Sequence, residues 1–151
     1  MLFSIAKILR EKGFDSLQIQ KLTYIIFGFY AAKYDEYLFD DRIEAWKYGP
    51  VIPILYKEIK GGGEEVYNAP AIEDKKVLKT INNIINTYGK KDGTWLIDRT
   101  HAEDTPWSEV YKKNQNIEIP RKLIKSYYKK ILETQRFLNN YRDVFEALAR
   151  T

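Results

Sequence analysis

The segment LQIQKLTYIIFGFYAAKY (residues 17–34) carries an apolar stripe with helical spacing. Residues at i, i+3, i+4, i+7 and i+8 are Leu22, Ile25, Ile26, Phe29 and Tyr30. This spacing predicts an amphipathic helix with its stripe toward the core, and Asp15 or Ser16 stands where a side chain caps a first turn. Gly28 lies inside the helix. Because an interior glycine costs about 1 kcal/mol relative to alanine, it indicates either close packing of a neighbouring element or a weak point.

The residues on either side of this segment predict a second helix and a small hairpin. Residues 2–12 form a helix that closes at Gly13, a residue type suited to a left-handed C-terminal cap. Residues 37–47, YLFDDRIEAWK, alternate aromatic or β-branched residues around an Asp-Asp-Arg turn. That alternation predicts a short β-hairpin.

Glycine and proline punctuate the next part of the chain. Tyr48, Gly49 and Pro50 break it, and Pro53 suits the first position of a helix. The glycine triplet at residues 61–63 ends that helix. We expect the triplet to open a loop that extends to about residue 70.

The C-terminal half is predicted to be helical. Helices are expected at residues 74–88, after a cap at Thr94, and from Pro106 after a cap at Asp104 or Thr105. A long last helix begins at Pro120, and its apolar residues keep an approximate heptad phase: Ile124, Tyr127, Ile131, Leu138, Tyr141, Phe145 and Leu148. The stripe permits a dimer, but stripes of this kind more often pack within their own domain. We therefore expect residues 137–149 to be a docked structural helix.

The chain is thus predicted to be mainly α. It is expected to be a compact single domain, residues 1–151, of six to seven helices with one short β-hairpin near residues 37–47 and a long C-terminal helix. Residues from about 131 to 151 form a helical extension of that domain.

The composition is typical of one globular domain in the cytoplasm. Of 151 residues, 44% are hydrophobic and 30% charged, and no apolar run approaches the ~20 residues of a membrane span. The charges after the first six residues stand in the reverse order of a secretory signal. The absence of cysteine removes disulfides, thiolate metal sites and cysteine nucleophiles. The net charge is +4, and residues 111–151 hold ten Lys or Arg against four Asp or Glu.

No motif indicates catalysis. The single histidine, His101, lies beside Glu103 and Asp104, where a carboxylate could orient a general base, but it has no recognisable nucleophile partner. Other carboxylate pairs are adjacent in sequence, which turns and caps explain. The chain has neither a dinucleotide-binding nor a P-loop glycine motif. We predict that the protein is not an enzyme and uses no cofactor and no metal.

Basic residues follow one face of the last helix. Lys122, Lys125, Lys129 and Arg136 are spaced by 3, 4 and 7 residues. A solvated surface, an acidic protein partner and a nucleic-acid contact all fit this ridge. No helix-turn-helix or RNA-binding motif accompanies it.

A longer stretch resembles a known family. The segment IQKLTYIIFGFYAAKYDEYLFDDRIEAWKYGPVIPILYKEIK (residues 19–60) resembles the signature of the Panacea domain family, which includes SocA-like and phage-associated GepA-type proteins. RTHAEDTPWSEVY (99–111) and NIEIPRKLIKSYY (116–128) continue the resemblance, which covers about residues 5–130 and departs from the family at Phe27 and Phe29. We expect the matching positions to be structural: Gln20, Lys21, Tyr24, Gly28, Tyr30, Gly49, Pro50, His101, Pro106 and Trp107.

The resemblance implies an antitoxin that neutralises a co-encoded protein toxin by direct contact and without turnover. Family genes of this kind are frequent in phages and prophages. A proteolytic adaptor for a toxin or other client and a nucleic-acid-binding autoregulator are the alternatives. The oligomeric state is open.

Partner contacts are expected at two places. One comprises Trp46, Tyr48, Pro53 and Tyr56, because aromatic residues often dominate interface energetics. The other is the basic ridge at Lys122, Lys125 and Lys129. The first set has a second interpretation, in which the turn needs glycine and proline and the aromatic residues wedge the hairpin against its neighbours.

Overall fold

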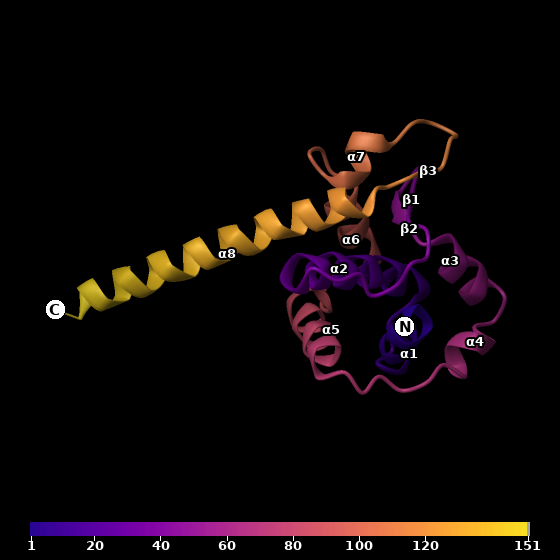
Figure 1. Ribbon diagram of the computed structural model, residues 1–151, viewed down its shortest axis with the longest axis horizontal. Coiled ribbons are helices and arrows are strands. Elements are labelled where there is room, and N and C mark those ends of the chain that lie inside the picture. The colour runs from indigo at the N-terminus through magenta and orange to yellow at the C-terminus, as the bar shows by residue number, and fades with distance from the viewer. Residues whose placement is uncertain (151) are drawn as a thin grey trace.

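Helix α2 (Ser16–Tyr34) is the central element of the computed structural model, which describes residues 1–150 (Figure 1). Asp15 caps this helix. The Asp15 carboxylate accepts a hydrogen bond from the Gln18 N–H at 2.8 Å, and the Gln18 side chain accepts one from the Asp15 N–H at 3.0 Å. This reciprocal pair is a capping box, so the predicted helix and its cap are confirmed.

The prediction that α2 is amphipathic is wrong, because the helix is buried on all sides. Every residue from 19 to 31 is buried. The helices that pack against α2 are α1 (Leu2–Glu11), α5 (Lys75–Tyr88), α6 (Gly93–Thr100) and α8 (Arg121–Ala149). In the sequence, the polar residues Gln20, Lys21 and Thr23 suggest a solvent-exposed face of α2, but all three are buried in the structure.

The other elements are short. They are β1 (Glu44–Trp46), β2 (Gly49–Val51), α3 (Pro53–Lys60), α4 (Glu64–Tyr67), α7 (Pro106–Val110) and β3 (Ile117–Glu118). Residues 1–150 therefore contain eight helices and one three-stranded antiparallel sheet, which confirms a mainly α protein with a long C-terminal helix. No helix in this part of the chain is long and apolar enough to cross a membrane.

The hairpin lies further along the chain than predicted. Its turn is at Lys47 and Tyr48, and the register pairs Trp46 with Gly49. The expected Asp-Asp-Arg turn is absent from the described chain, because Phe39 and Ile43 on either side of it are buried and draw the segment along the core. Rather than breaking the chain, Gly49 and Pro50 lie in β2, an edge strand in the order β2-β1-β3, where proline is tolerated.

Two local predictions are wrong: one expected a loop where α4 forms, and the other assigned the cap of α6 to the wrong residue. In both places a carboxylate caps the helix. The expected loop from residue 61 to residue 70 contains α4, since the Glu58 carboxylate accepts hydrogen bonds from the Glu65 and Val66 N–H groups. Helix α6 is capped by Asp92, which accepts from the Trp95 N–H at 2.9 Å, and not by Thr94. The predicted boundaries at Gly13, Pro53, Thr105 and Pro120 are confirmed, as is the helix at residues 74–88.

Gly28 is the point at which α8 reaches α2. A Cβ atom at position 28 would overlap the Tyr128 ring. That ring is buried and lies 4.7 Å from the Phe29 ring, centroid to centroid. Of the two explanations offered for Gly28, close packing of a neighbouring element is confirmed.

The outer part of α8 does not dock. Ile124 and Tyr128 are buried, but every residue from 133 to 149 is exposed. Figure 1 shows this part projecting past the ends of α2 and α5. The prediction that residues 137–149 are a docked helix is therefore wrong, because α2 ends at Tyr34 and no element lies beneath α8 beyond that point.

We expect Gly28→Ala to lower the free energy of unfolding by up to about 2 kcal/mol. Overpacking typically costs 1–3 kcal/mol, and the helix propensity of alanine returns about 1 kcal/mol. In a Tyr128→Ala background the ring is gone, and the same change should be neutral or stabilising. Urea denaturation of the four proteins in this cycle measures the difference. An equal cost in both backgrounds would contradict the contact.

Candidate functional site

Gln20 holds the end of the hairpin to the central helix. Its Nε2 donates to the Ile52 carbonyl, and its Oε1 accepts from the Ile52 N–H, both at 3.1 Å. The side-chain amide therefore pairs with the backbone as a neighbouring strand would. Both residues are buried, so an unpaired group at either position would be costly.

Lys21 is a buried cation beside Gln20. Its Nζ donates to the Pro50 carbonyl at 2.7 Å, and the residue is 2% exposed. Within residues 1–150 it forms no ion pair with a carboxylate. Burial lowers the pKa of Lys21 from 10.5 to about 8, because the charged form loses its hydration. We call these contacts of Gln20 and Lys21 with residues 50–52 the clamp.

Gly49 lies beside the clamp in a backbone conformation that favours glycine. Its φ is +114°, and a Cβ there would lie 3.2 Å from Lys21 Nζ and 3.4 Å from both Thr100 Oγ1 and His101 Cβ. A side chain would therefore meet both backbone strain and crowding.

His101 and Trp107 hold the hairpin from its other side. The Trp107 indole N–H donates to the Trp46 carbonyl at 2.6 Å. The His101 Nδ1 contacts the Ile97 carbonyl in the last turn of α6, and its ring packs edge-on against Trp107 with centroids 5.2 Å apart. Pro106 is buried at the start of α7. His101 therefore ends helix α6 and packs against Trp107.

The exposed side of the hairpin and α3 gathers apolar side chains. Trp46 is half-buried and meets Tyr56 in an edge-to-face pair with centroids 5.3 Å apart. Tyr48 at the turn is 62% exposed, and Pro53 is half-buried. Ile54 is also exposed, although we did not predict it, and it lines a separate hollow with residues of α1 and α4. The next residue, Leu55, faces the core, so the helical geometry of α3 directs Ile54 away from the core. That spacing could have identified Ile54 as exposed from the sequence.

Lysines surround this surface. Lys47, Lys57 and Lys60 are exposed. The Lys47 Nζ lies 5.3 Å from the centroid of the Tyr48 ring, and the Lys60 Nζ lies 5.7 Å from that of Tyr56. We call the apolar surface of Trp46, Tyr48, Pro53 and Tyr56, with its three lysines, the hairpin face.

The predicted basic ridge on α8 is divided in the structure. Lys122 and Lys129 are exposed. Lys125 lies between them but forms an ion pair with Asp35, the left-handed residue that ends α2. Lys125 therefore joins α8 to α2. Because Asp35 is largely exposed, the pair contributes little stability.

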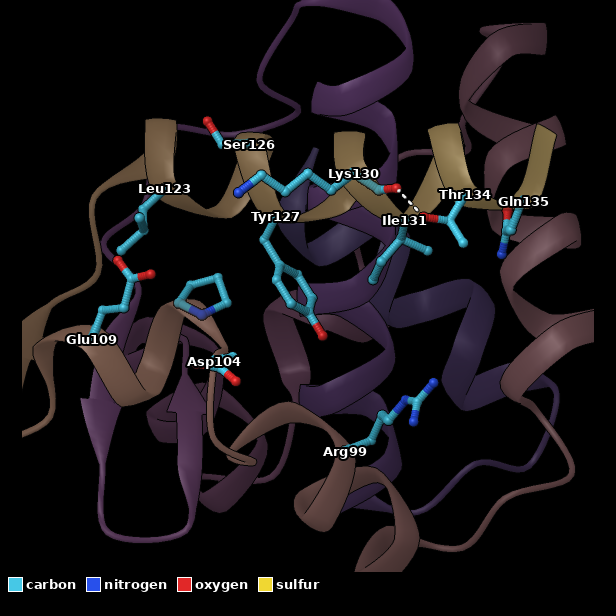
Figure 2. Close-up of a pocket in the computed structure, with 11 residues that line it drawn as sticks. Arg99, Asp104, Glu109, Leu123, Ser126, Tyr127, Lys130, Ile131, Thr134 and Gln135 are labelled. Carbon is cyan, nitrogen blue, oxygen red and sulfur yellow. Dashed lines mark hydrogen bonds between the residues drawn. The ribbon is translucent and has the colours of Figure 1, made fainter. Parts of the chain in front are cut away.

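A cavity of about 540 Å³ lies between α8 and α7 (Figure 2). Tyr127 and Ile131 point into it from α8, and Arg99 approaches from the opposite side. Asp104 and Glu109 are the carboxylates on its wall. The described residues contain no group of three His, Cys, Asp or Glu side chains that could hold a metal ion.

The family profile described as "Antitoxin SocA-like, Panacea domain" matches residues 19–108. The chain belongs to this family of SocA-like antitoxins. The matched region of the Panacea domain includes the clamp, the hairpin face and the His101–Trp107 pair, and it ends before α8. Membership confirms the resemblance seen in the sequence and suggests a non-enzymatic role.

A curated relative agrees with this assignment. The protein named "Antitoxin SocA" from Caulobacter vibrioides (strain NA1000 / CB15N) is 24% identical over 128 residues, covering 71% of this chain and 68% of the relative. No solved structure is significantly similar to the chain.

The buried charge of Lys21 predicts a pH dependence of stability. Below about pH 8, Lys21 is protonated in both states, and the folded state bears the full desolvation cost. Between about pH 8 and 10.5 the unfolded state binds more protons, so the free energy of unfolding rises with pH. We expect wild type to gain about 2 kcal/mol relative to Lys21→Met between pH 7 and 9.5.

Urea denaturation of both proteins at the two pH values tests this expectation. The upper value stays below pH 10, because burial raises the pKa of Tyr24 and Tyr128 and ionisation of these residues would then favour unfolding. A constant difference between wild type and Lys21→Met would show that Lys21 keeps an ordinary pKa.

Proposed function

We propose that this protein is an antitoxin that binds a protein toxin directly and blocks it without turnover. The family match over residues 19–108 carries the proposal, since the family is defined by its antitoxins. The relative named as an antitoxin supports it. The family match favours neither a proteolytic adaptor nor a nucleic-acid-binding regulator.

We infer that the hairpin face is the surface that meets the toxin. Tyrosine and tryptophan supply much of the binding energy at protein interfaces, and Tyr48 and Tyr56 are both exposed here. The clamp fixes the backbone beneath them on its buried side. A surface fixed in this way loses little conformational entropy on binding.

The charges around the hairpin face indicate the kind of partner surface. Lys47, Lys57 and Lys60 are exposed at its edges. A toxin surface with an apolar centre and an acidic rim would complement this arrangement. Lys122 and Lys129 remain a predicted second contact for an acidic partner, and Lys125 is less available because of its ion pair with Asp35.

Co-expression tests the proposed function. We expect the product of the neighbouring gene to arrest growth of host cells when expressed alone, and this protein to restore growth and co-purify with that product. A harmless neighbour would argue against a co-encoded toxin. Restored growth without a stable complex would argue against direct binding.

Substitutions test the proposed surface. We expect Tyr48→Ala and Tyr56→Ala each to raise the Kd for the toxin about thirtyfold, which is about 2 kcal/mol, because both remove an anchor side chain. Tyr67→Ala is the matched control, since Tyr67 is an exposed tyrosine on α4 outside the hairpin face. Calorimetric titration measures the Kd, and unchanged melting temperatures would confirm intact folds. If Tyr67→Ala alone weakened binding, the surface would lie elsewhere.

A further inference from the structure

The outer part of α8 carries a continuous row of exposed apolar side chains. They are Phe137, Leu138, Tyr141, Val144, Phe145 and Leu148, each between 56% and 68% exposed. We call this row the α8 stripe. It lies on the part of α8 that projects from the body (Figure 1) and outside the region matched by the family.

The α8 stripe follows a coiled-coil pattern. Leu138 and Phe145 occupy heptad positions a, and Tyr141 and Leu148 occupy positions d. The same phase extends back through Thr134, Ile131, Tyr127 and Ile124 without interruption. Phe137 and Val144 fall at position g, beside the seam. A sequence of this kind is suited to packing along another helix.

The size of the α8 stripe indicates a protein partner. Six large side chains exposed by about two thirds present roughly 600–800 Å², taking about 150–200 Å² for each. Soluble monomers usually expose apolar patches of about 300–600 Å² at most. A stable interface buries about 800 Å² per partner, so the stripe has the area that one side of a dimer needs.

We propose that the α8 stripe pairs with the α8 stripe of a second copy of this chain, the two helices running antiparallel. One register places Leu138 opposite Tyr141, Phe145 opposite Thr134, and Leu148 opposite Ile131 of the second copy. Each layer then joins a position a to a position d. In the same register Phe137 and Val144 of the second copy, both at flanking position g, lie diagonally next to each other beside the seam, so both are also covered.

The charges of α8 agree with self-pairing. Residues 133–150 contain three arginines, at 136, 142 and 150, and three acidic residues, at 133, 143 and 146, so their net charge is zero. Two copies therefore do not repel each other. In the proposed register Arg142 and Gln135 of the second copy, both at flanking position e, are diagonal neighbours, and neither is paired with a like charge. A neutral helix of this kind also lacks the basic face that nucleic acid or an acidic membrane surface would attract.

The cavity at the base of α8 lies on the same face as the stripe. Tyr127, Ile131 and Thr134 line it (Figure 2), and they precede Leu138 in the same heptad phase. In the antiparallel pair, Phe145 and Leu148 of the second copy pack at the mouth of this cavity. The dimer therefore covers one surface that runs from the cavity to the end of the helix.

Sedimentation equilibrium of the purified full chain tests the proposal. We expect a species of twice 17.9 kDa at micromolar concentrations. Leu138→Glu should raise the dimer Kd at least a hundredfold, because each dimer then contains two buried charges. Asn139→Glu is the matched control, since it adds the same side chain one residue away on the opposite face and should leave the Kd unchanged. Equal melting temperatures would show that the body folds in both variants.

Disulfide trapping tests the register, because the chain has no cysteine of its own. A mixture of Thr134→Cys and Phe145→Cys proteins should give a mixed disulfide dimer, whereas neither protein alone should cross-link efficiently. A monomer at all concentrations would overturn the proposal. Cross-linking of Leu148→Cys to itself would show a parallel pair and would also overturn it. None of these results depends on whether the protein neutralises a toxin.

Discussion

The hydrogen bonds from Gln20 and Lys21 to the backbone of residues 50–52 are the constraint on which the rest of the structure depends. They require α2 to bury an amide and a cation, which is costly unless both groups are paired. In return, a hairpin with three-residue strands is held to the most buried helix of the protein. The hairpin then fixes the start of α3 through Ile52, and Trp107 closes the other side through the Trp46 carbonyl. Buried polarity therefore determines where the exposed tyrosines stand.

A second contact divides the chain into a packed part and a projecting part. Where Gly28 meets the Tyr128 ring, the two long helices approach closely, and the first turns of α8 cover α2. Only Ile124 and Tyr128 of α8 are fully buried among the described residues. Beyond Leu132 the helix has left the body, so the apolar residues that follow contribute nothing to the monomer core. In the proposed dimer, the second copy would cover them.

Much of this fold could be predicted from the sequence, and the failures share a physical cause. Helical spacing, Asp15 and the proline at position 53 located helices correctly because these signals are local. The environment of a helix is not local. The sequence around Gln20 and Lys21 would be the same if these residues were on a solvated face instead of in the clamp. Likewise, the heptad pattern of α8 is the same whether the helix packs against the body or projects from it. Trp46, Tyr48 and Tyr56 were found from their residue types, whereas Ile54 required knowledge of which way α3 faces.

The hairpin face and the α8 stripe lie at opposite ends of the molecule. Figure 1 shows the hairpin and α3 on one side of the body and the free end of α8 extending from the other. An antiparallel pair built on the stripe would overlap along α8 and carry the two bodies at its ends, with each hairpin face directed outward. Self-association and toxin binding would then use separate surfaces and would not compete. Because the family match stops before α8, the toxin-binding part would be common to the family, and the arrangement of two such parts in one assembly would be a property of this chain.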